Sequence, residues 1–458
     1  MEKGLSVNLG VTLAVAAVLV AASGSGAALL GLAAVAAVAL WVGRRLETLP
    51  KAGLLAIVAL APLGYLGAQV SFGVLNSFTK LVFLPAFAVL VGEWALCRRP
   101  LALGGGQGVW ALGFGACFLM SYLANTHTIH STWFLSRLVS MLLLFVLTAN
   151  VMRSDRDLAL LLAVMVIACG FSAVASVAMP VMAAPNPVMN NGTVVRMTGW
   201  SANDAPTFGS DLLISLLTCL YFAIVTRRWW LRALLAAAAA GFLIGIVYTY
   251  ARGVSLVMVL SAGYLLFRLR RRLSWTGVAV AVAAVLCLAP FLPEAYWDRM
   301  GTALTQFSSD ATIGRRLDTW RIGWKLFEQS PLLGFGPGNF IVQYMSPEFR
   351  FDRAGVPSVC FNLFLSVATQ AGLMGLVALG GVLLLAFRNL RRLSDSFGTE
   401  EPLLQHITEL LNIALVTLLM MSLFEPTDFQ KTLWIVLGAI VAAAHIRRQQ
   451  QGDGVPVS

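Results

Sequence analysis

Three arginines, Arg196, Arg252 and Arg316, are the residues of this chain best suited to chemistry on an anionic group. Gly199 and Gly253 lie close to the first two, and backbone can approach a ligand closely where a side chain is absent. A planar guanidinium donates two parallel hydrogen bonds to phosphate oxygens. A few such groups in a partly dehydrated cavity stabilise developing negative charge without a metal ion. We therefore predict that Arg196 and Arg252 approach each other and bind a phosphate-containing ligand, with Arg316 closing over it.

The third arginine belongs to a stretch that is both charged and aromatic, GRRLDTWRIGWKLFEQSPLLGFGPGNF, from Gly314 to Phe340. Its periodicity predicts an amphipathic helix over 313–330. The apolar residues recur on one face of that helix: Leu317, Trp320, Trp324 and Phe327. Pro331 predicts that the helix ends at Ser330. Tight turns that bring backbone amides close to a ligand are then allowed by three glycines: Gly334, Gly336 and Gly338.

The elements that must position these residues are apolar segments. Hydrophobic residues make up 59% of the chain, charged residues 12%, and the mean hydropathy is +0.81, which no soluble core requires. We predict an all-α fold, a polytopic membrane helical bundle of about 14 transmembrane helices. The expected spans are 5–22, 27–43, 53–70, 74–96, 107–125, 132–152, 156–180, 207–226, 230–250, 253–268, 275–292, 358–386, 404–424 and 430–446. The amphipathic helix is expected to lie near the membrane plane.

Basic residues orient the predicted spans. With the N-terminus inside, alternate short loops and the two ends carry 20 of the 32 Lys and Arg residues. The positive-inside rule makes that side cytoplasmic, so both termini are predicted in the cytoplasm and 293–357 on the outer side. The net charge of +11 is therefore mostly a consequence of topology and does not indicate nucleic-acid binding.

This orientation predicts the outcome of a labelling experiment. A cysteine placed at Asp310 should react with a membrane-impermeant reagent while the inner membrane is intact, because 293–357 is predicted outside. Labelling that requires disruption of that membrane would refute the topology.

The predicted topology divides the chain into four parts. These are N-terminal transmembrane helices at 1–180, core transmembrane helices with outer-face arginines at 181–292, a large outer loop with the amphipathic helix at 293–357, and C-terminal transmembrane helices with a cytoplasmic tail at 358–458. Several basic residues on the outer side run against the positive-inside rule: Arg196, Arg252, Arg299, Arg315, Arg316, Arg321, Lys325, Arg350 and Arg353. An anionic ligand at the outer leaflet explains their placement.

Other kinds of site are not indicated by the sequence. The 6 cysteines lie almost entirely within or beside predicted spans, as small buried apolar residues do. The 4 histidines form no zinc motif, and the chain has no Walker loop, dinucleotide fingerprint or G-x-S-x-G. We therefore expect no metal, no cofactor and no nucleotide-driven transport.

Four segments occur in a fixed order on the predicted outer side. They are VRMTGWSANDAPTFGSDLL (Val195–Leu213), YTYARGVSLVMVLSAG (Tyr248–Gly263), the Gly314–Phe340 stretch, and CFNLFLSVATQAGLMGL (Cys360–Leu376). Their order, spacing and shared placement resemble the bacterial O-antigen ligase and O-antigen polymerase superfamily, over roughly residues 190–440. Members of that superfamily are integral membrane glycosyltransferases, and they take a glycan from an undecaprenyl pyrophosphate carrier.

The resemblance implies a metal-independent glycosyltransferase of the bacterial inner membrane, with 293–357 as a periplasmic loop. Its partners would be an undecaprenyl-pyrophosphate-linked glycan, a glycan acceptor and membrane lipid. The expected catalytic arginines are Arg196, Arg252 and Arg316, which would stabilise the departing diphosphate. The expected substrate-binding residues are Arg315, Arg321, Trp320, Asn339 and Asn362.

One departure from the superfamily affects the acceptor. Many members, ligases especially, carry a histidine where this chain has Phe361, and a carboxylate often stands where it has Gln370. This favours polymerisation of lipid-linked repeats, or a ligase that uses a different base. Ligation of a finished glycan to lipid A core or another acceptor is the alternative reaction. A transporter or flippase is a second alternative, although charges gather at the outer ends of spans rather than inside them. The general base stays open among candidates that spacing cannot rank: Glu348, Asp352, Asp298, Glu425, His127 and His130.

Overall fold

The computed structural model describes residues 49–63, 86–91, 101, 106–178, 196–197, 205–270, 272, 290, 292–305, 311–349, 358–398, 402–426 and 430–452. Within these residues the secondary structure is helical throughout, with no strand. Eight of the described helices are long and apolar enough to cross a membrane. The prediction of an all-α, polytopic membrane protein is therefore confirmed.

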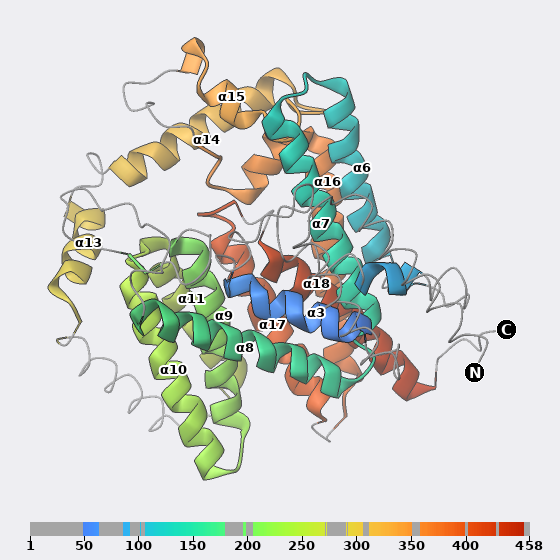
Figure 1. Cartoon of the computed structure of the whole chain (residues 1–458), viewed down its shortest axis with the longest axis vertical. Helices are drawn as coiled ribbons and strands as arrows, with labels where there is room; N and C mark the ends of the chain where they lie inside the picture. Colours follow the sequence, from blue (N-terminus) through green and yellow to red (C-terminus); the bar gives the residue numbers. More distant parts are fainter. Residues whose placement is uncertain are drawn as a thin grey trace, which may run out of the picture.

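The helices follow the predicted spans closely where both can be compared (Figure 1). The helices of the bundle are α3 (Leu49–Leu60), η2 (Ala61–Leu63), α6 (Gln107–Ala124), α7 (Ile129–Val151), α8 (Asp155–Ala178), α9 (Ala205–Val225), α10 (Trp229–Thr249), α11 (Arg252–Leu269), α16 (Leu363–Ser396), α17 (Leu403–Met421) and α18 (Lys431–Gln451). Of the other predicted spans, 5–22 and 27–43 lie outside the described residues, as do most of 74–96 and 275–292.

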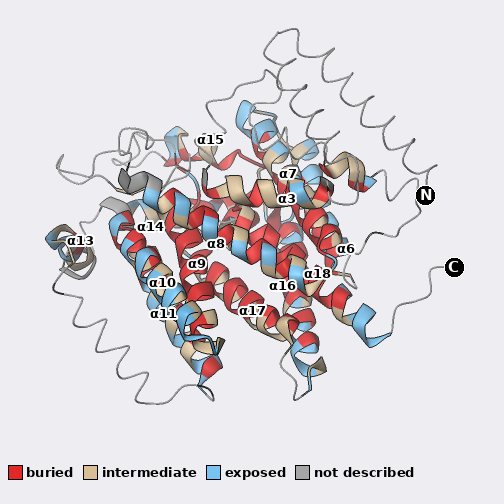
Figure 2. Ribbon diagram, turned by 60° about the horizontal axis from the view of Figure 1, so that its bottom comes forward, coloured by how far each residue is buried: buried red, intermediate tan, exposed pale blue. Residues whose placement is uncertain are grey.

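The centre of the bundle is formed by α9, α17 and α18. Burial runs almost unbroken along α18 from Thr432 to Ala444, and along α9 from Phe208 to Cys219. In Figure 2 these helices are mostly red, while α10 and α11 carry exposed faces. α9 packs against α10, α6 against α16, and α7 against α18. A helix that is apolar on every side is buried among other helices, which suits this central position.

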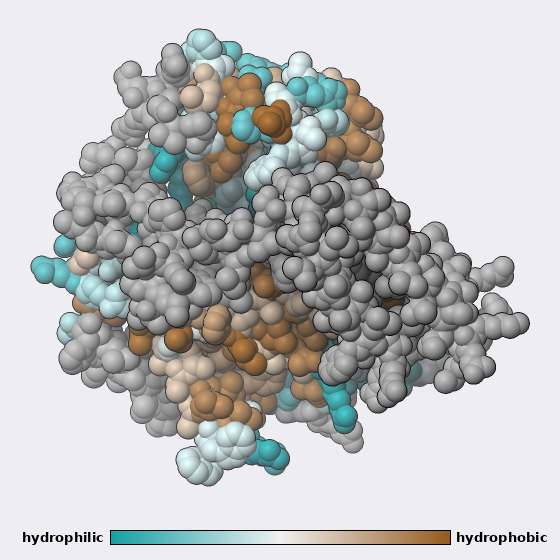
Figure 3. All heavy atoms as spheres, in the orientation of Figure 1, coloured by the Kyte–Doolittle hydropathy of each residue, from teal (hydrophilic) through white to brown (hydrophobic). Residues whose placement is uncertain are grey.

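The outer helices expose large apolar side chains. Examples on different helices are Ile167, Val174, Leu234, Val259 and Leu384, each more than half exposed. Figure 3 shows hydrophobic surface over the lower helices, where α8 and α10 lie in Figure 1. Soluble proteins rarely leave such surface uncovered, whereas lipid covers it in a membrane protein.

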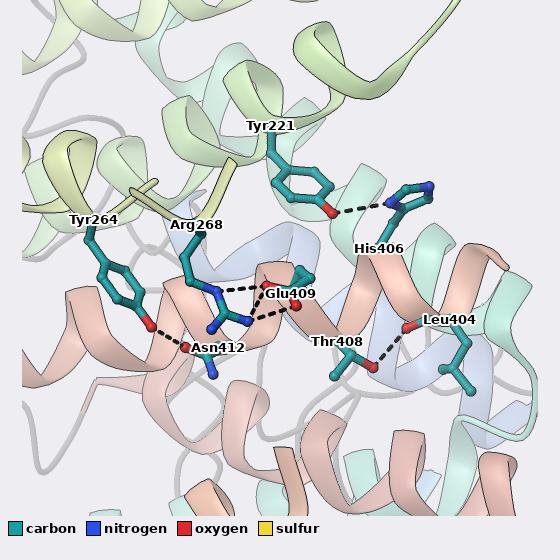
Figure 4. A network of polar contacts seen from close by, with 8 residues as sticks. All are labelled: Tyr221, Tyr264, Arg268, Leu404, His406, Thr408, Glu409 and Asn412. Atoms are coloured by element: carbon teal, nitrogen blue, oxygen red, sulfur yellow. Dashed lines mark hydrogen bonds and ion pairs between the residues drawn. The ribbon is translucent and has the colours of Figure 1, made fainter. Parts of the chain in front are cut away.

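Polar side chains fasten α11 and α9 to α17 at the end of the bundle where α11 finishes (Figure 4). Arg268 pairs with the Glu409 carboxylate, with Nε 2.9 Å from Oε2 and Nη2 2.7 Å from Oε1. One turn away, the Tyr264 hydroxyl donates to Asn412 Oδ1 at 2.7 Å. Nearer the start of α17, the Tyr221 hydroxyl of α9 lies 3.1 Å from His406 Nδ1. These contacts fix α17 between α9 and α11.

A layer of shorter helices lies at the upper left of the bundle in Figure 1, with α14 and α15 towards the top and α13 at the left edge. It contains α13 (Glu294–Thr305), α14 (Ala311–Gln329), α15 (Phe340–Tyr344) and η4 (Pro347–Phe349). α14 coincides with the predicted amphipathic helix and ends one residue before Ser330, as Pro331 indicated. α14 packs along α16, so this layer is anchored to the bundle.

The side of α14 that packs on the protein differs from the predicted apolar face. The buried positions are Thr319, Ile322, Gly323 and Leu326, whereas Leu317 and Trp324 are 37% and 57% exposed. Gly323 explains the difference, because a Cβ there would lie 2.9 Å from Leu365 Cγ and only glycine lets α14 approach α16 so closely. Leu317 and Trp324 therefore form an apolar edge that points away from the protein. The hydrophobic periodicity did not predict the side of α14 that packs on the bundle.

The three glycines after α14 also serve a purpose other than the predicted one. Gly334, Gly336 and Gly338 all have positive φ, but the loop they form lies against a break in α16 at Gly372. The amides of this loop donate to the protein: Phe335 N to Thr369 O at 2.8 Å, Gly336 N to Gln370 O at 3.2 Å, and Gly338 N to Gln370 Oε1 at 2.7 Å. The expectation that these amides approach a ligand is therefore wrong for the described structure.

Candidate active site

The connection between α10 and α11 is the point where the arginines meet. α10 ends at Thr249, and Tyr250 caps it in the left-handed conformation, with φ 50° and ψ 29°. α11 then begins directly at Arg252. In the part of the chain that the structure describes, Tyr250 is the single non-glycine residue with positive φ. Strained backbone of this kind gathers at functional sites, and we call residues 248–253 the hairpin turn.

Arg196 reaches the hairpin turn from a segment far away in the sequence. Its Nε donates to the Thr249 oxygen at 2.9 Å. The next residue, Met197, donates its amide to the Tyr248 oxygen at 2.9 Å. Main chain and side chain together therefore hold Arg196 against the turn, and the half-buried guanidinium lies beside the carboxyl end of α10.

Arg252 and Arg299 also lie at the hairpin turn, and each donates a hydrogen bond to a main-chain oxygen. Arg299, on α13, donates from Nε to the Tyr250 oxygen at 3.1 Å. Arg252 donates from its own Nε to the main-chain oxygen of Arg299 at 2.8 Å. The structure thus brings Arg196, Arg252 and Arg299 together around one turn. The bonds to the last carbonyls of α10 also neutralise the negative end of that helix.

Arg316 joins this group from α14. Its Nη1 lies 3.8 Å from the position that a Cβ on Gly253 would occupy, so it is next to the start of α11. Its Nη2 forms an ion pair with Glu425 Oε1 at 2.6 Å. The guanidinium carbon also lies 5.7 Å from the centre of the Phe361 ring. Arg316 therefore connects the hairpin turn with the segments at 361 and 425.

This arrangement can bind a polyanion. Four guanidinium groups around one turn repel one another unless negative charge lies among them, and Glu425 supplies such a charge at Arg316. The N-terminus of α11 at Arg252 adds its positive dipole end, and no side chain caps it. A diphosphate would satisfy several guanidinium groups at once, because each can donate two hydrogen bonds to phosphate oxygens.

Two of the predicted substrate-binding residues lie beside this group and hold its frame. Trp320 donates from its ring nitrogen to the Phe361 oxygen at 3.1 Å, which ties α14 to the start of α16. Asn362 caps α16 by accepting from Leu365 N at 3.0 Å. Arg315 and Arg321 are exposed on α14, and the side chain of Arg321 is 73% exposed. Their role in binding substrate stays a prediction.

Asn339 lies elsewhere, between the glycine loop and the start of α7. Its Oδ1 accepts from Ser131 Oγ at 2.8 Å and from Thr128 Oγ1 at 3.1 Å. Its Nδ2 donates to the Phe335 oxygen at 2.8 Å and to the Thr126 oxygen at 3.1 Å. These four bonds use the full capacity of a side-chain amide. Asn339 therefore holds the loop in place and has no group left for a substrate.

Sequence reasoning placed Arg299 and Glu425 on the outer side but did not select them for the site. Spacing gives no signal for either, because they come from α13 and from the turn after α17. Of the other base candidates, Asp352 lies outside the described residues, and four are exposed: Glu348, Asp298, His127 and His130. Only the three-dimensional structure identifies these two residues. Arg299 accepts a hydrogen bond from Arg252, and Glu425 forms an ion pair with Arg316.

Comparison with known proteins supports the interpretation of the residues around the hairpin turn. Residues 237–380 match a family model described as O-antigen ligase. The match supports the resemblance of this region to the O-antigen ligase and polymerase superfamily. The match includes Arg252, Arg299 and Arg316, whereas Arg196 and Glu425 fall outside it. No curated protein matches the chain.

The superfamily match supports a membrane enzyme that processes lipid-linked glycans. Three of the four segments that carry the resemblance lie within 237–380, and the first, Val195–Leu213, precedes it. The hairpin turn, α14 and the break in α16 therefore all lie within the matched residues. The match does not distinguish ligase from polymerase.

Proposed function

We propose that the protein is a membrane glycosyltransferase that polymerises undecaprenyl-pyrophosphate-linked oligosaccharide repeats at the periplasmic face of the bacterial inner membrane. The diphosphate of the donor binds among Arg196, Arg252, Arg299 and Arg316. The sugar at its end is transferred to a hydroxyl of the acceptor glycan. The lipid diphosphate is the leaving group.

The convergence of the arginines on the hairpin turn is the observation that carries this proposal. When the glycosyl bond breaks, negative charge develops on the departing diphosphate. Preorganised guanidinium groups stabilise that charge, since Arg196 and Arg299 are already fixed through Nε at 2.9 Å and 3.1 Å from main-chain oxygens. No metal ion is required for this step in the proposal.

Ligation is the alternative reaction of the same site. It differs only in the acceptor, which would be lipid A core or another molecule in place of a growing chain. Phe361 favours polymerisation, because ligases especially carry a histidine there. Export is a further alternative, and the dense packing of α9, α17 and α18 at the centre of the described bundle argues against a path through it.

Product analysis tests the proposal. Purified protein in lipid vesicles is given a lipid-linked repeat unit, and the products are separated by size. A ladder of lengths is expected for a polymerase. A single capped species, formed only when lipid A core is added, would instead identify a ligase, and no covalent product in either case would exclude both.

A further inference from the structure

We propose that Glu425 is the general base that takes the proton from the acceptor hydroxyl, and that Arg316 holds it until the donor diphosphate arrives. This inference rests on the proposed glycosyl transfer. It adds a catalytic residue that spacing in the sequence cannot select. Burial, position and partner all point to this carboxylate.

Burial separates Glu425 from the other carboxylates on the predicted outer side that the structure describes. Glu425 is 6% exposed. Four of the others are exposed, Glu294, Asp298, Glu328 and Glu348, and Asp318 is intermediate, with a side chain 17% exposed against 8% for Glu425. Asp211 is also buried, but it lies two turns inside α9 and accepts from Thr432 Oγ1 at 2.6 Å. A buried carboxylate beside cations is the usual setting of an acid or base at an active site.

Local structure explains why Glu425 stands at the hairpin turn. α17 ends at Met421, and the Glu425 amide still donates to the Met421 oxygen at 3.0 Å, so the chain continues in a helical turn. The Leu363 amide donates to the Ser422 oxygen at 2.9 Å, which joins this turn to the start of α16. Phe424 Cβ lies 3.5 Å from the position of a Cβ on Gly253. The carboxylate is therefore held next to α11.

The ion pair between Glu425 and Arg316 couples the release of the Glu425 carboxylate to the binding of the donor. A carboxylate just beyond the carboxyl end of a helix is electrostatically unfavourable, and Arg316 compensates for this at 2.6 Å. An incoming diphosphate competes for the same guanidinium. Once Arg316 turns to the diphosphate, the Glu425 carboxylate loses its ion pair with that guanidinium and accepts a proton.

Proton transfer and glycosyl transfer occur together in this step. The acceptor O–H bond breaks and its proton moves to the Glu425 carboxylate. The oxygen forms a bond to the anomeric carbon of the donor, while the bond from that carbon to the diphosphate oxygen breaks. The electron pair of that bond stays on the diphosphate oxygen, and the diphosphate leaves still attached to its lipid. Glu425 then releases its proton to water before the next cycle.

Substitution of Glu425 by glutamine tests this role. Glutamine keeps the size of the side chain and an oxygen for Arg316, but it cannot take a proton. We expect Glu425→Gln to lower kcat by about 10²–10⁴-fold, with little change in KM for the lipid-linked donor. The acid limb of the wild-type kcat profile should disappear in Glu425→Gln, and formate should restore part of the activity of Glu425→Ala.

Glu409→Gln is the matched control, because it weakens the Arg268–Glu409 pair, another ion pair between an arginine and a glutamate, at the opposite end of α11 from the hairpin turn. It should leave kcat unchanged. Wild-type kcat in Glu425→Gln would overturn the proposal, as would a raised KM with an unchanged acid limb, which would mean that Glu425 only positions Arg316. Failure of the proposed function itself is distinct: wild-type protein would then form no product at any pH.

Discussion

Replacement of Arg252 or Arg196 by alanine is expected to lower glycan transfer by about 10²–10³-fold, by analogy with removal of one oxyanion donor. Both arginines lie at the hairpin turn, and each would lose contact with the departing diphosphate. Activity is measured as the rate of product formation by purified variants in lipid vesicles. Protein amount and melting temperature are recorded alongside, because Arg196 and Arg252 also bind main-chain oxygens there.

Lysine substitutions separate binding of an anion from capping of a helix. An ammonium group can donate to the Thr249 oxygen as Arg196 does, so Arg196→Lys should fold normally. It cannot present the planar fork that two phosphate oxygens accept. We therefore expect Arg196→Lys and Arg252→Lys to be stable and largely inactive.

Arg232 provides the control arginine. It lies at the opposite end of α10, where its Nη2 donates to the Thr226 oxygen at 2.8 Å. Arg232→Ala removes a comparable bond between an arginine and a main-chain carbonyl, away from the proposed site, and should leave transfer at the wild-type rate. If Arg196→Ala and Arg252→Ala both match that rate, the diphosphate does not bind at the hairpin turn.

Membrane class and helix positions followed from the sequence because both depend on local composition. An apolar run long enough to span a membrane forms a helix, because a helix makes all of its backbone hydrogen bonds within the segment and lipid offers none. Local periodicity likewise located α14, and Pro331 sets the end of that helix. It placed Arg196, Arg252 and Arg316 on one side of the membrane, and the structure gathers them at one turn.

The partners of these residues did not follow, because they depend on packing between distant segments. Gly323 turns α14 so that Ile322 and Leu326 face inward, against the hydrophobic periodicity. Glu425 meets Arg316 across 109 residues of chain. The spacing of residues along the sequence does not predict contacts between distant segments. Those contacts determine which side chains meet at the site.

The break in α16 shows how the glycine loop supports the site. Gly372 has φ 64° and ψ −160°, which only glycine adopts without strain, and it separates two helical arms. The amide of Leu373 at the start of the second arm donates to the Pro331 oxygen at 2.7 Å. The Thr369 oxygen of the first arm accepts from Phe335 at 2.8 Å. The loop and the two arms therefore satisfy each other's backbone, and the first arm begins at Asn362, beside the arginines.

Gly372→Ala should consequently be among the most destabilising single substitutions in the described chain. An added Cβ would lie 2.2 Å from the Leu332 oxygen and 2.3 Å from its carbonyl carbon, in backbone that cannot move without losing its hydrogen bonds. Overpacking costs about 1–3 kcal/mol and left-handed backbone about 1–2 kcal/mol more, so we expect a loss of about 2–5 kcal/mol in the free energy of unfolding.

Thermal unfolding in detergent measures this loss, with Gly380→Ala as the control on the same helix. Nothing lies within 4 Å of a Cβ at Gly380, so alanine there should be neutral or stabilising, by about 0.4–1 kcal/mol. Gly372→Ala should unfold at a clearly lower temperature and lose transfer activity with it, because displacement of the first arm moves Asn362 and the turn that carries Glu425. Equal melting temperatures for the two variants would show that the break in α16 tolerates a side chain and that the loop does not depend on it.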